Sequence, residues 1–313
     1  MKDMDNRSVF QIGLNALEFA NYQDKTPYMI KDNINNYGYL KLKFVNDNKK
    51  SILSGVERNV PLMVQRPFYW DESLPKMPYV LIISTSGCIS QGDRLNLVIE
   101  SSPETYAHIS TPTATKIHAM SNNYAALLQS FDIGKQSYIE YMPNQTIPYN
   151  NSRFISHTNI TIHPTATLLY SEILMSGRKY HLSDGGFKFD IYSTSTIVKN
   201  SYQKILFAET SVLQPHKYPL NGIGTMGFFE VFGNVILLTP KIYHKKILAS
   251  LSNYEKFDKT IACGVSKLPN HCGLIIKILG KKSYEVKNQI KIFWKIVRQK
   301  ILGVNSTQIF TWN

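Results

Sequence analysis

Residues 79–101, YVLIISTSGCISQGDRLNLVIES, contain two apolar runs joined by a glycine-containing turn. YVLIIS and the alternating LNLVIE both have the composition of buried β-strands. Asp93 and Arg94 lie between them, directly after Gly92. Three interpretations account for an acidic residue at this place: a phosphate-binding loop, a metal site, or a turn that positions one carboxylate at the end of a sheet.

Short alternating runs continue on both sides of this stretch, from YLKLKFV at residue 39 to FKFDIYS at residue 187. Clusters of Gly, Pro, Asn and Ser interrupt them about every ten residues, which is typical of a β-sandwich, a barrel or a β-solenoid. Residues 1–35 show little periodicity beyond a short helix expected around GLNALEFA, and KDNINNYG has the composition of a polar linker. The central part of the chain is therefore predicted to be β-rich.

Helical signals gather near the C-terminus. TPKIYHKKILASLSNY, residues 239–254, opens with a Thr-Pro start signal, and SYEVKNQIKIFWKIVRQKILG occupies residues 283–303. The apolar face of this second helix is predicted to contain Val286, Ile290, Phe293 and Val297. The rest of the surface of this helix is predicted to contain Lys287, Lys291, Lys295 and Arg298. This pattern favours a helix packed on a sheet with a solvated basic face over a helix that binds lipid or nucleic acid. Between the two helices, TIACGVSKLP and CGLIIKILG are predicted to pair as strands.

The composition is that of a folded protein. Of the 313 residues, 43% are hydrophobic and 18% charged, which excludes wholesale disorder. The net charge of +13 is mostly dispersed lysine, which does not favour nucleic-acid binding, and a basic surface suits an acidic protein partner equally well. No segment has the apolar length of a membrane span, and the first residues lack a signal core, so we expect a cytoplasmic protein without membrane contact. Three cysteines without CxxC spacing predict reduced thiols.

Motifs of catalysis are missing from the sequence. It contains no GxxxxGK[ST], no GxGxxG before a helix, no HExxH and no GxSxG. No two of the eight histidines are spaced to form a metal clamp on a helix. The sequence therefore predicts a protein that is not an enzyme and holds no permanent cofactor.

Isolated carboxylates within apolar strands remain as candidate functional residues: Asp93, Glu140 in YIEYMP, and Glu172 in LLYSEILMSGR. Burying a lone carboxylate is costly unless it is hydrogen-bonded, paired with a cation or in contact with internal water. Arg94 and Arg178 are the candidate ion-pair partners. The pattern alone favours structural ion pairs or exposed strand faces over a functional role.

Several local motifs resemble the UreD family of urease accessory proteins, also called UreH. They are PLMVQRPFY (61–69), SGCISQGDRL (86–95), STPTATKIH (110–118), IEYMPNQTIPYNNS (139–152), SEILMSGRKY (171–180), GVSKLPNHCGLIIKILG (264–280) and FWKIVRQKILG (293–303). The resemblance covers about residues 39–304, with residues 1–38 as an N-terminal extension and 305–313 as a short tail.

This resemblance implies an elongated, mainly β, β-helix-like or stacked-sheet body with two C-terminal α-helices. It further implies a scaffold that acts with UreF and, through UreF, with the GTPase UreG in a higher-order symmetric complex that delivers nickel to the urease structural subunits. GTP is then used by UreG, and Ni²⁺ passes through an internal channel of the UreD-like chain. The alternative is a β-sandwich binding module or enzyme unrelated to urease.

Family motifs also assign roles to individual residues. Asp93, Glu140 and Glu172 match family acidic positions and become candidate residues of a transient nickel channel, because separated oxygen donors hold an ion without trapping it. The candidates for a structural or interaction role are Gly92, Arg94, Thr113, Lys116, Gly177 and Arg178. The chain departs from the family where Thr85, Ser86, Gly87 and Cys88 replace Pro-Pro-Gly-Gly, and where Asn144, Gln145 and Thr146 replace Gln-Glu-Thr.

Overall fold

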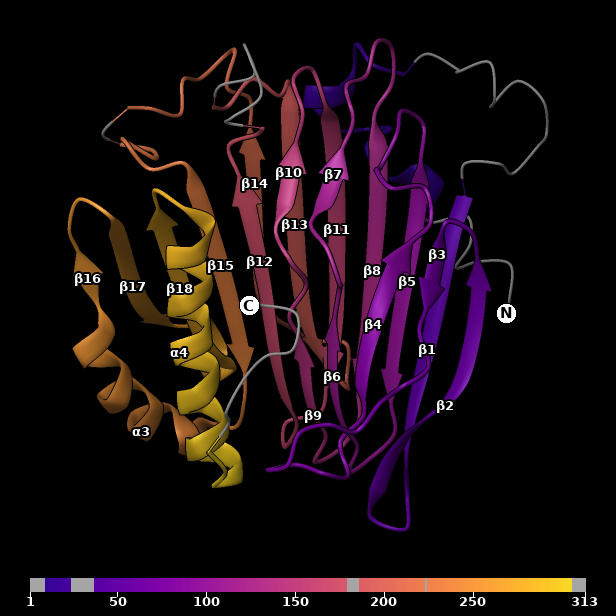
Figure 1. Cartoon of the computed structure of the whole chain (residues 1–313), viewed down its shortest axis with the longest axis vertical. Coiled ribbons are helices and arrows are strands. Elements are labelled where there is room, and N and C mark those ends of the chain that lie inside the picture. Colours follow the sequence, from indigo (N-terminus) through magenta and orange to yellow (C-terminus); the bar gives the residue numbers. More distant parts are fainter. Residues whose placement is uncertain (1–8, 24–36, 179–185, 223, 306–313) are drawn as a thin grey trace.

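The computed structural model describes residues 9–23, 37–178, 186–222 and 224–305. They form two large sheets that face each other, with the C-terminal helices at one end of the molecule (Figure 1). The mainly β architecture predicted from the alternating runs is confirmed. The predicted linker at residues 31–38 and the tail at 305–313 lie mostly outside the described residues.

The first sheet has the spatial order β14-β13-β11-β8-β5-β1-β2. Its strands are β1 (Tyr37–Asp47), β2 (Lys50–Asn59), β5 (Arg94–Ser101), β8 (Ala125–Ile133), β11 (Arg153–Ile162), β13 (Ile191–Asn200) and β14 (Ile205–Leu213). We call it the seven-stranded sheet.

The second sheet has the order β16-β17-β18-β15-β12-β9-β6-β4-β3, with β10 beside β12 and β7 beside β10. Its strands are β3 (Leu62–Val64), β4 (Tyr79–Ser84), β6 (Tyr106–Ser110), β7 (Thr115–Ile117), β9 (Tyr138–Tyr141), β10 (Thr146–Pro148), β12 (Thr167–Met175), β15 (Val231–Leu238), β16 (Lys256–Phe257), β17 (Ile261–Lys267) and β18 (Gly273–Gly280). We call it the eleven-stranded sheet.

Between β4 and β13 the chain alternates between the two sheets, so that it winds like a β-helix. Successive strands within each sheet are parallel: β5, β8, β11 and β13 in one, and β4, β6, β9 and β12 in the other. Parallel strands need a long crossover connection, and here each connection is a strand of the opposite sheet. The strands β15, β18 and β17 then extend the eleven-stranded sheet in antiparallel fashion, and the predicted β17–β18 pair is confirmed.

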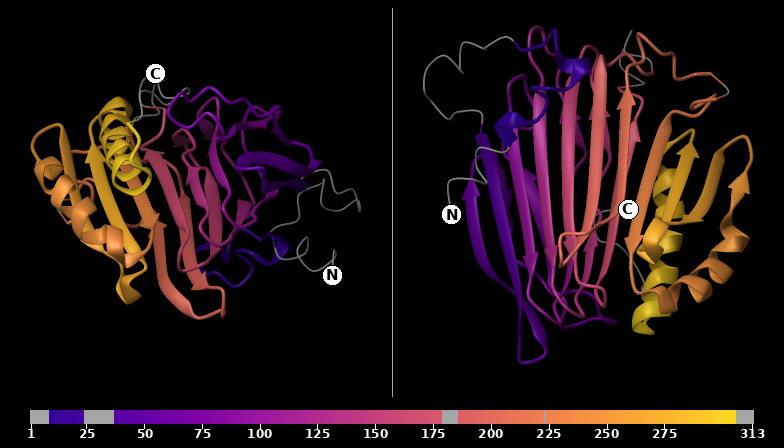
Figure 2. Two further views of the ribbon diagram at one scale, coloured as in Figure 1. Left: turned by 90° about the horizontal axis from the view of Figure 1, so that it is seen from below. Right: turned by 180° about the vertical axis from the view of Figure 1, so that it is seen from behind.

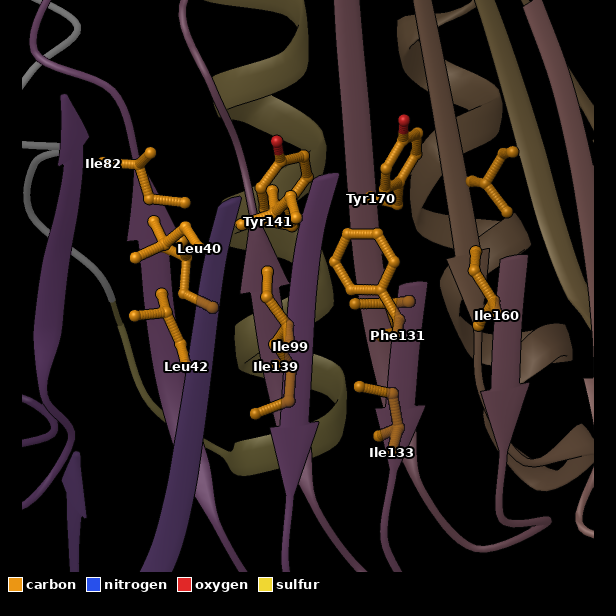
Figure 3. Close-up of a cluster of buried hydrophobic side chains, with 14 of the residues drawn as sticks. Leu40, Leu42, Ile82, Ile99, Phe131, Ile133, Ile139, Tyr141, Ile160 and Tyr170 are labelled. Carbon is orange, nitrogen blue, oxygen red and sulfur yellow. The ribbon is translucent and has the colours of Figure 1, made fainter. Parts of the chain in front are cut away.

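The main core lies between the sheets. Figure 3 shows inward-facing side chains of both, among them Leu40, Ile99 and Phe131 from the seven-stranded sheet and Ile82 and Ile139 from the eleven-stranded sheet. Because successive residues of a strand point to opposite faces, the alternating pattern of the sequence places one apolar set in this core. Each fully buried side chain of this size contributes about 1.5–3 kcal/mol.

The outer faces of the two sheets are covered differently. Residues 9–23, which include a 3-10 helix at Leu17–Phe19 where the sequence predicted a short helix, pack on the seven-stranded sheet (Figure 2). There the Phe19 ring lies 4.7 Å from that of Tyr124, whose hydroxyl donates to the Ile12 carbonyl at 2.8 Å. The C-terminal helices α3 (Lys241–Leu251) and α4 (Ser283–Leu302) cover part of the eleven-stranded sheet. The 3-10 helix Ser252–Tyr254 follows α3, and the 3-10 helix Pro269–His271 connects β17 to β18 and contacts β14.

Both C-terminal helices form where the sequence predicts them. The apolar face of α4 is confirmed, since its four predicted residues and Trp294 are buried against the sheet. The helix approaches the sheet closely at two glycines. A Cβ atom at Gly233 or at Gly280 would lie only 2.7 or 2.6 Å from a methyl group of Val286, so both positions require glycine.

Replacing Gly233 with Ala is expected to destabilise the protein by roughly 1–3 kcal/mol, because the added methyl group pushes α4 away from the sheet. Gly264→Ala on β17 is the matched control, since nothing lies within 4 Å of the added atom. Urea denaturation, monitored by circular dichroism, measures the stability of both variants. Equal stability of the two variants would contradict the close approach of α4.

Candidate functional site: a polar path between the sheets

Three cavities lie one after another in the space between the two sheets. The loop-side cavity, about 150 Å³, is bordered by Gly87 and Cys88 and by threonines that include Thr113. The central cavity, about 90 Å³, shares Leu127 and Tyr141 with it. The edge cavity, about 70 Å³, shares Glu172 and Tyr192 with the central cavity. Each has room for several water molecules, and each neighbouring pair of cavities shares wall residues.

A chain of hydrogen bonds crosses the central cavity. Tyr141 donates to Gln129 Oε1 at 2.9 Å, and Gln129 Nε2 donates to the Tyr170 hydroxyl and to Thr158 Oγ1, both at 3.0 Å. Tyr170 in turn donates to Glu172 Oε1 at 2.5 Å. The rings of Tyr141 and Tyr170 stack with centroids 5.4 Å apart, and Figure 3 shows both hydroxyl groups pointing the same way beyond Phe131. A polar path therefore runs through an otherwise apolar core.

Glu172 is the acidic residue of this path. Its half-buried side chain lines both the central and the edge cavity. Burial raises the pKa of Glu172, and the charge of Glu209 raises it further, whereas the Tyr170 hydroxyl and the Lys277 ammonium oppose the change. A carboxylate with little compensation at the wall of a polar cavity can accept a proton or a cation.

Asp93 lies on the turn whose Gly87 and Cys88 line the loop-side cavity, but Asp93 itself is not among the residues that line this cavity. Its carboxylate accepts a hydrogen bond from the Ser90 backbone N–H at 2.7 Å, and Gly92 adopts a φ of 83° in this turn. Burial raises the pKa of Asp93 to about 6, although the Ser90 N–H and the Arg94 charge act in the opposite direction. Of the three interpretations open for this stretch, the turn that positions a carboxylate at the end of a strand describes its geometry.

The side chains of Asp93 and Arg94 do not form the expected direct ion pair. The buried Arg94 guanidinium donates to the backbone carbonyls of Tyr124, at 2.7 Å, and of Asp93, at 3.0 Å, and it lies 4.4 Å from the centre of the Tyr124 ring. Arg94 thus ties the beginning of β5 to the beginning of β8. The two side chains diverge because adjacent residues at the beginning of a strand point to opposite faces.

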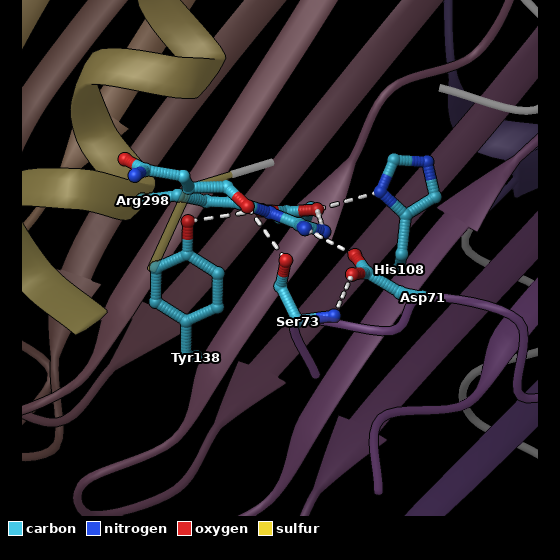
Figure 4. Close-up of polar contacts among 7 residues, drawn as sticks. Asp71, Ser73, His108, Tyr138 and Arg298 are labelled. Atoms are coloured by element: carbon cyan, nitrogen blue, oxygen red, sulfur yellow. Dashed lines mark hydrogen bonds and ion pairs between the residues drawn. The ribbon is translucent and has the colours of Figure 1, made fainter. Parts of the chain in front are cut away.

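Glu140 lies on the opposite face of its sheet from the cavities. On β9, Ile139 and Tyr141 point into the core between the sheets, whereas Tyr138 and Glu140 point toward α4. Arg298 of α4 binds the Glu140 carboxylate through Nε, at 2.7 Å, and through a terminal nitrogen, at 2.8 Å (Figure 4). This bidentate pair is buried, which separates Glu140 from the path that contains Glu172.

Further groups complete the surroundings of this ion pair. His108 Nδ1 lies 2.6 Å from Glu140 Oε2, the Tyr138 hydroxyl donates to Glu140 Oε1 at 2.9 Å, and Arg298 also pairs with Asp71. Burial alone would raise the pKa of Glu140, but Arg298 and then His108 hold it well below its usual range. Burial lowers the pKa of His108, so a neutral imidazole donates from Nδ1.

The prediction of a solvated basic face on α4 is wrong for Arg298. Its side chain is 1% exposed, while Lys295 is exposed as expected. Trp294, one turn before Arg298, lies 4.2 Å from the guanidinium. The presence of Trp294 four positions before Arg298 indicated in the sequence that this side of α4 is buried.

The remaining candidates lie in two places. Thr113 and Lys116 line the loop-side cavity. Gly177, with a φ of 137°, and Arg178 border a surface groove beside the first turn of α4, and the Arg178 guanidinium lies 4.1 Å from the centre of the Tyr149 ring. The suggested pairing of Arg178 with Glu172 is therefore wrong, because Glu172 faces the inter-sheet cavities.

Sequence reasoning also missed the polar residues that accompany Glu172. The parallel pairing of β8 and β11 places Gln129 beside Thr158, and the packing of the two sheets brings Tyr170 of β12 to them. Within the described part of the chain, no group of three or more His, Cys, Asp or Glu side chains is arranged to hold a metal ion. An ion in the cavities would meet separated oxygen donors.

Removing either partner of the Arg298–Glu140 pair is expected to destabilise the protein by about 3–5 kcal/mol, because the other charge stays buried without compensation. Arg298→Met and Glu140→Gln test this in urea denaturation. The double variant should lose less than the sum of the two single variants. Full additivity would contradict a direct pair.

The pH dependence of the same pair has a defined sign. The folded-state pKa of Glu140 is below its unfolded value, so its contribution is present above the unfolded pKa of about 4.3 and is lost as the pH falls further. The difference in unfolding free energy between the original chain and Glu140→Gln should therefore shrink below about pH 4. A difference that grows in acid would contradict the assignment.

Asp93 is expected to behave in the opposite way. Since its folded pKa of about 6 is raised, the stability that this group contributes falls as the pH rises from about 4 to 6. Asp93→Asn keeps an acceptor for the Ser90 N–H and should be more stable than the original chain by about 1 kcal/mol at pH 7.5, but not at pH 4. Asp93→Ala, which lacks the acceptor, is the control. A less stable Asn variant at pH 7.5 would contradict the account of the turn.

No helix within the described ranges combines the length and the apolar character that crossing a membrane requires.

Comparison with known proteins identifies relatives of the whole chain. The family model described as UreD urease accessory protein matches residues 36–313. A urease accessory protein UreD of Photorhabdus laumondii is 53% identical over 301 residues, which are 96% of this chain and 94% of the relative. A UreD of Yersinia enterocolitica is 48% identical over 307 residues, with the same coverage, and UreD 2 of Brucella suis is 39% identical over 297 residues, covering 95% and 98%. The chain belongs to the UreD family of urease accessory proteins.

Proposed function

We propose that this chain is a non-catalytic scaffold through which Ni²⁺ passes on its way into apo-urease. Nickel is the cargo and travels between the two sheets, along the series of cavities. The observation that carries this proposal is the position of Glu172, a half-buried carboxylate at the wall shared by two cavities. Among the described residues, the cation near Glu172 is the partly exposed Lys277, which pairs with Glu209, whereas Glu140 is held by the buried, bidentate Arg298.

The donor chemistry of the path suits transfer better than storage. Ni²⁺ accepts carboxylate, hydroxyl, amide and water oxygens, but a tight protein site would also supply clustered imidazole or thiolate ligands. Among the described residues, the central cavity offers one carboxylate, Glu172, and the edge cavity adds Glu209, with hydroxyl and amide groups between. Weak, successive sites allow an ion to enter and also to leave.

The three acidic candidates now receive different roles. Glu172 contacts the ion in transit, and Asp93 positions the turn at the loop-side cavity, where Cys88 and the threonines of that wall are nearest to the path. Glu140 is a structural residue that holds α4, because its carboxylate is already occupied on the other face of the sheet.

Membership of the UreD family supports the partners proposed for this chain. UreF binds this scaffold, and UreG, attached through UreF, hydrolyses GTP, for which the present chain has no phosphate loop. The urease structural subunits receive the metal, and the whole forms a higher-order symmetric complex in the cytoplasm. The scaffold needs no active site of its own in such an assembly.

Glu172→Gln tests the transit role, because it removes the anion but keeps the size and the hydrogen-bonding capacity of the side chain. In cells that express the complete urease operon, this variant should lower the nickel content and the activity of purified urease several-fold. Its melting temperature should stay near that of the original chain. Glu57→Gln, an exposed change of the same chemistry on β2, is the matched control and should leave urease loading unchanged.

The result that contradicts the proposal is normal nickel loading with Glu172→Gln at normal amounts of complex. A loss of loading in proportion to a loss of stability would instead make Glu172 a structural residue. Nickel analysis and melting curves on the same preparations separate these outcomes.

A further inference from the structure

The edge cavity contains a row of three polar side chains on adjacent strands. In the register of the eleven-stranded sheet, Glu172 on β12 lies opposite Asn234 on β15, and Asn234 lies opposite Lys277 on β18. All three line the edge cavity. Paired residues point to the same face of a sheet, so the row presents a carboxylate, an amide and an ammonium group to one small space.

Glu209 of the seven-stranded sheet faces this row from the other side. It lies on β14, the edge strand of that sheet, and forms an ion pair with Lys277 across the cavity. The Glu209 and Lys277 side chains are 28% and 40% exposed, which places their pair at the open rim, whereas Asn234 is 7% exposed. The row therefore runs from the rim across the buried Asn234 to Glu172, which also lines the central cavity.

Two features of this site point to a ligand. First, the Oδ1 atom of Asn234 is buried and has no hydrogen-bond partner among the described residues, although leaving a buried acceptor unpaired is costly. Second, the charges do not balance, since two carboxylates, Glu172 and Glu209, meet the single ammonium of Lys277. One net negative charge remains, and a divalent cation in place of the ammonium would neutralise the site.

We infer that Lys277 is a displaceable internal cation at the rim of the path. Its ammonium occupies the position beside Glu209 while the site is empty. A divalent cation that enters takes over the oxygens of Glu209, Asn234 and Glu172, and the Lys277 side chain moves out to solvent.

The side chain of Lys277 is suited to this exchange. Lysine carries a point charge on a flexible stem with four carbon atoms, and its head can reach water while the stem stays on the protein surface. Its ammonium also lies 5.4 Å from the centre of the Phe232 ring. A partly exposed ion pair of this kind is weak, so a divalent ion can compete with it. The inference rests on the proposed transit of nickel and adds the control of its entry or exit.

Titration of the full-length chain with Ni²⁺ alone, followed by calorimetry, tests the inference. Lys277→Met removes the competing cation and should tighten binding at one site by roughly three- to tenfold. Lys277→Gln, which is also neutral, serves as a second variant should the Met variant fold poorly. Lys267→Met, an exposed change of equal charge on the neighbouring strand β17, should leave the affinity unchanged.

A second substitution locates the effect. When Glu172→Gln is combined with Lys277→Met, the gain in Ni²⁺ affinity should be lost, because the Glu172 carboxylate is then missing. An affinity that is the same with and without Lys277, or a gain that survives Glu172→Gln, would overturn the inference. Lys277→Met should also load urease at lower external nickel than the original chain if transit is correct. Tighter binding without any effect of Glu172→Gln on urease loading would uphold the cation site and reject the transit function.

Discussion

The buried ion pair between Arg298 and Glu140 is the constraint that orders the rest of the molecule. A bidentate guanidinium–carboxylate contact fixes both partners in distance and in orientation, and here it joins the last turns of α4 to the middle of the eleven-stranded sheet. Because Glu140 must face α4, its neighbours Ile139 and Tyr141 must face the other sheet. The pair thus sets which face of β9 forms the wall of the inter-sheet space, at a desolvation cost that the surrounding hydrogen bonds offset.

The winding of the chain explains how a polar path can exist inside this space. Strands from distant parts of the sequence lie side by side in register, so one polar residue per strand produces a row across a sheet. Gln129 and Thr158 meet in this way on β8 and β11, and Glu172, Asn234 and Lys277 meet on β12, β15 and β18. Each buried polar group that bonds to the next avoids the cost of an unpaired one. The surrounding apolar side chains provide the stability, and the polar rows line the route that we propose for the cation.

The sequence predicted the strands and helices well, and the relations between them poorly. The apolar spacing of α4 and the antiparallel β17–β18 pair follow from periodicities of 3.6 and 2 residues, and both are local properties. The burial of Arg298 depends on a carboxylate 158 positions away, which no local pattern contains. For the same reason the sequence singled out Glu140 and Glu172 as equals, although they lie on opposite faces of one sheet, and it did not connect Glu209 or Lys277 with either.

The central claim is that a cation passes between the two sheets beside Glu172. An anomalous difference map at the nickel absorption edge, from crystals of the full-length chain equilibrated with Ni²⁺, tests it most directly. The account predicts a peak in the inter-sheet space, within coordination distance of Glu172 oxygen atoms, which disappears in Glu172→Gln crystals. Peaks confined to surface histidines, with none between the sheets, would contradict it.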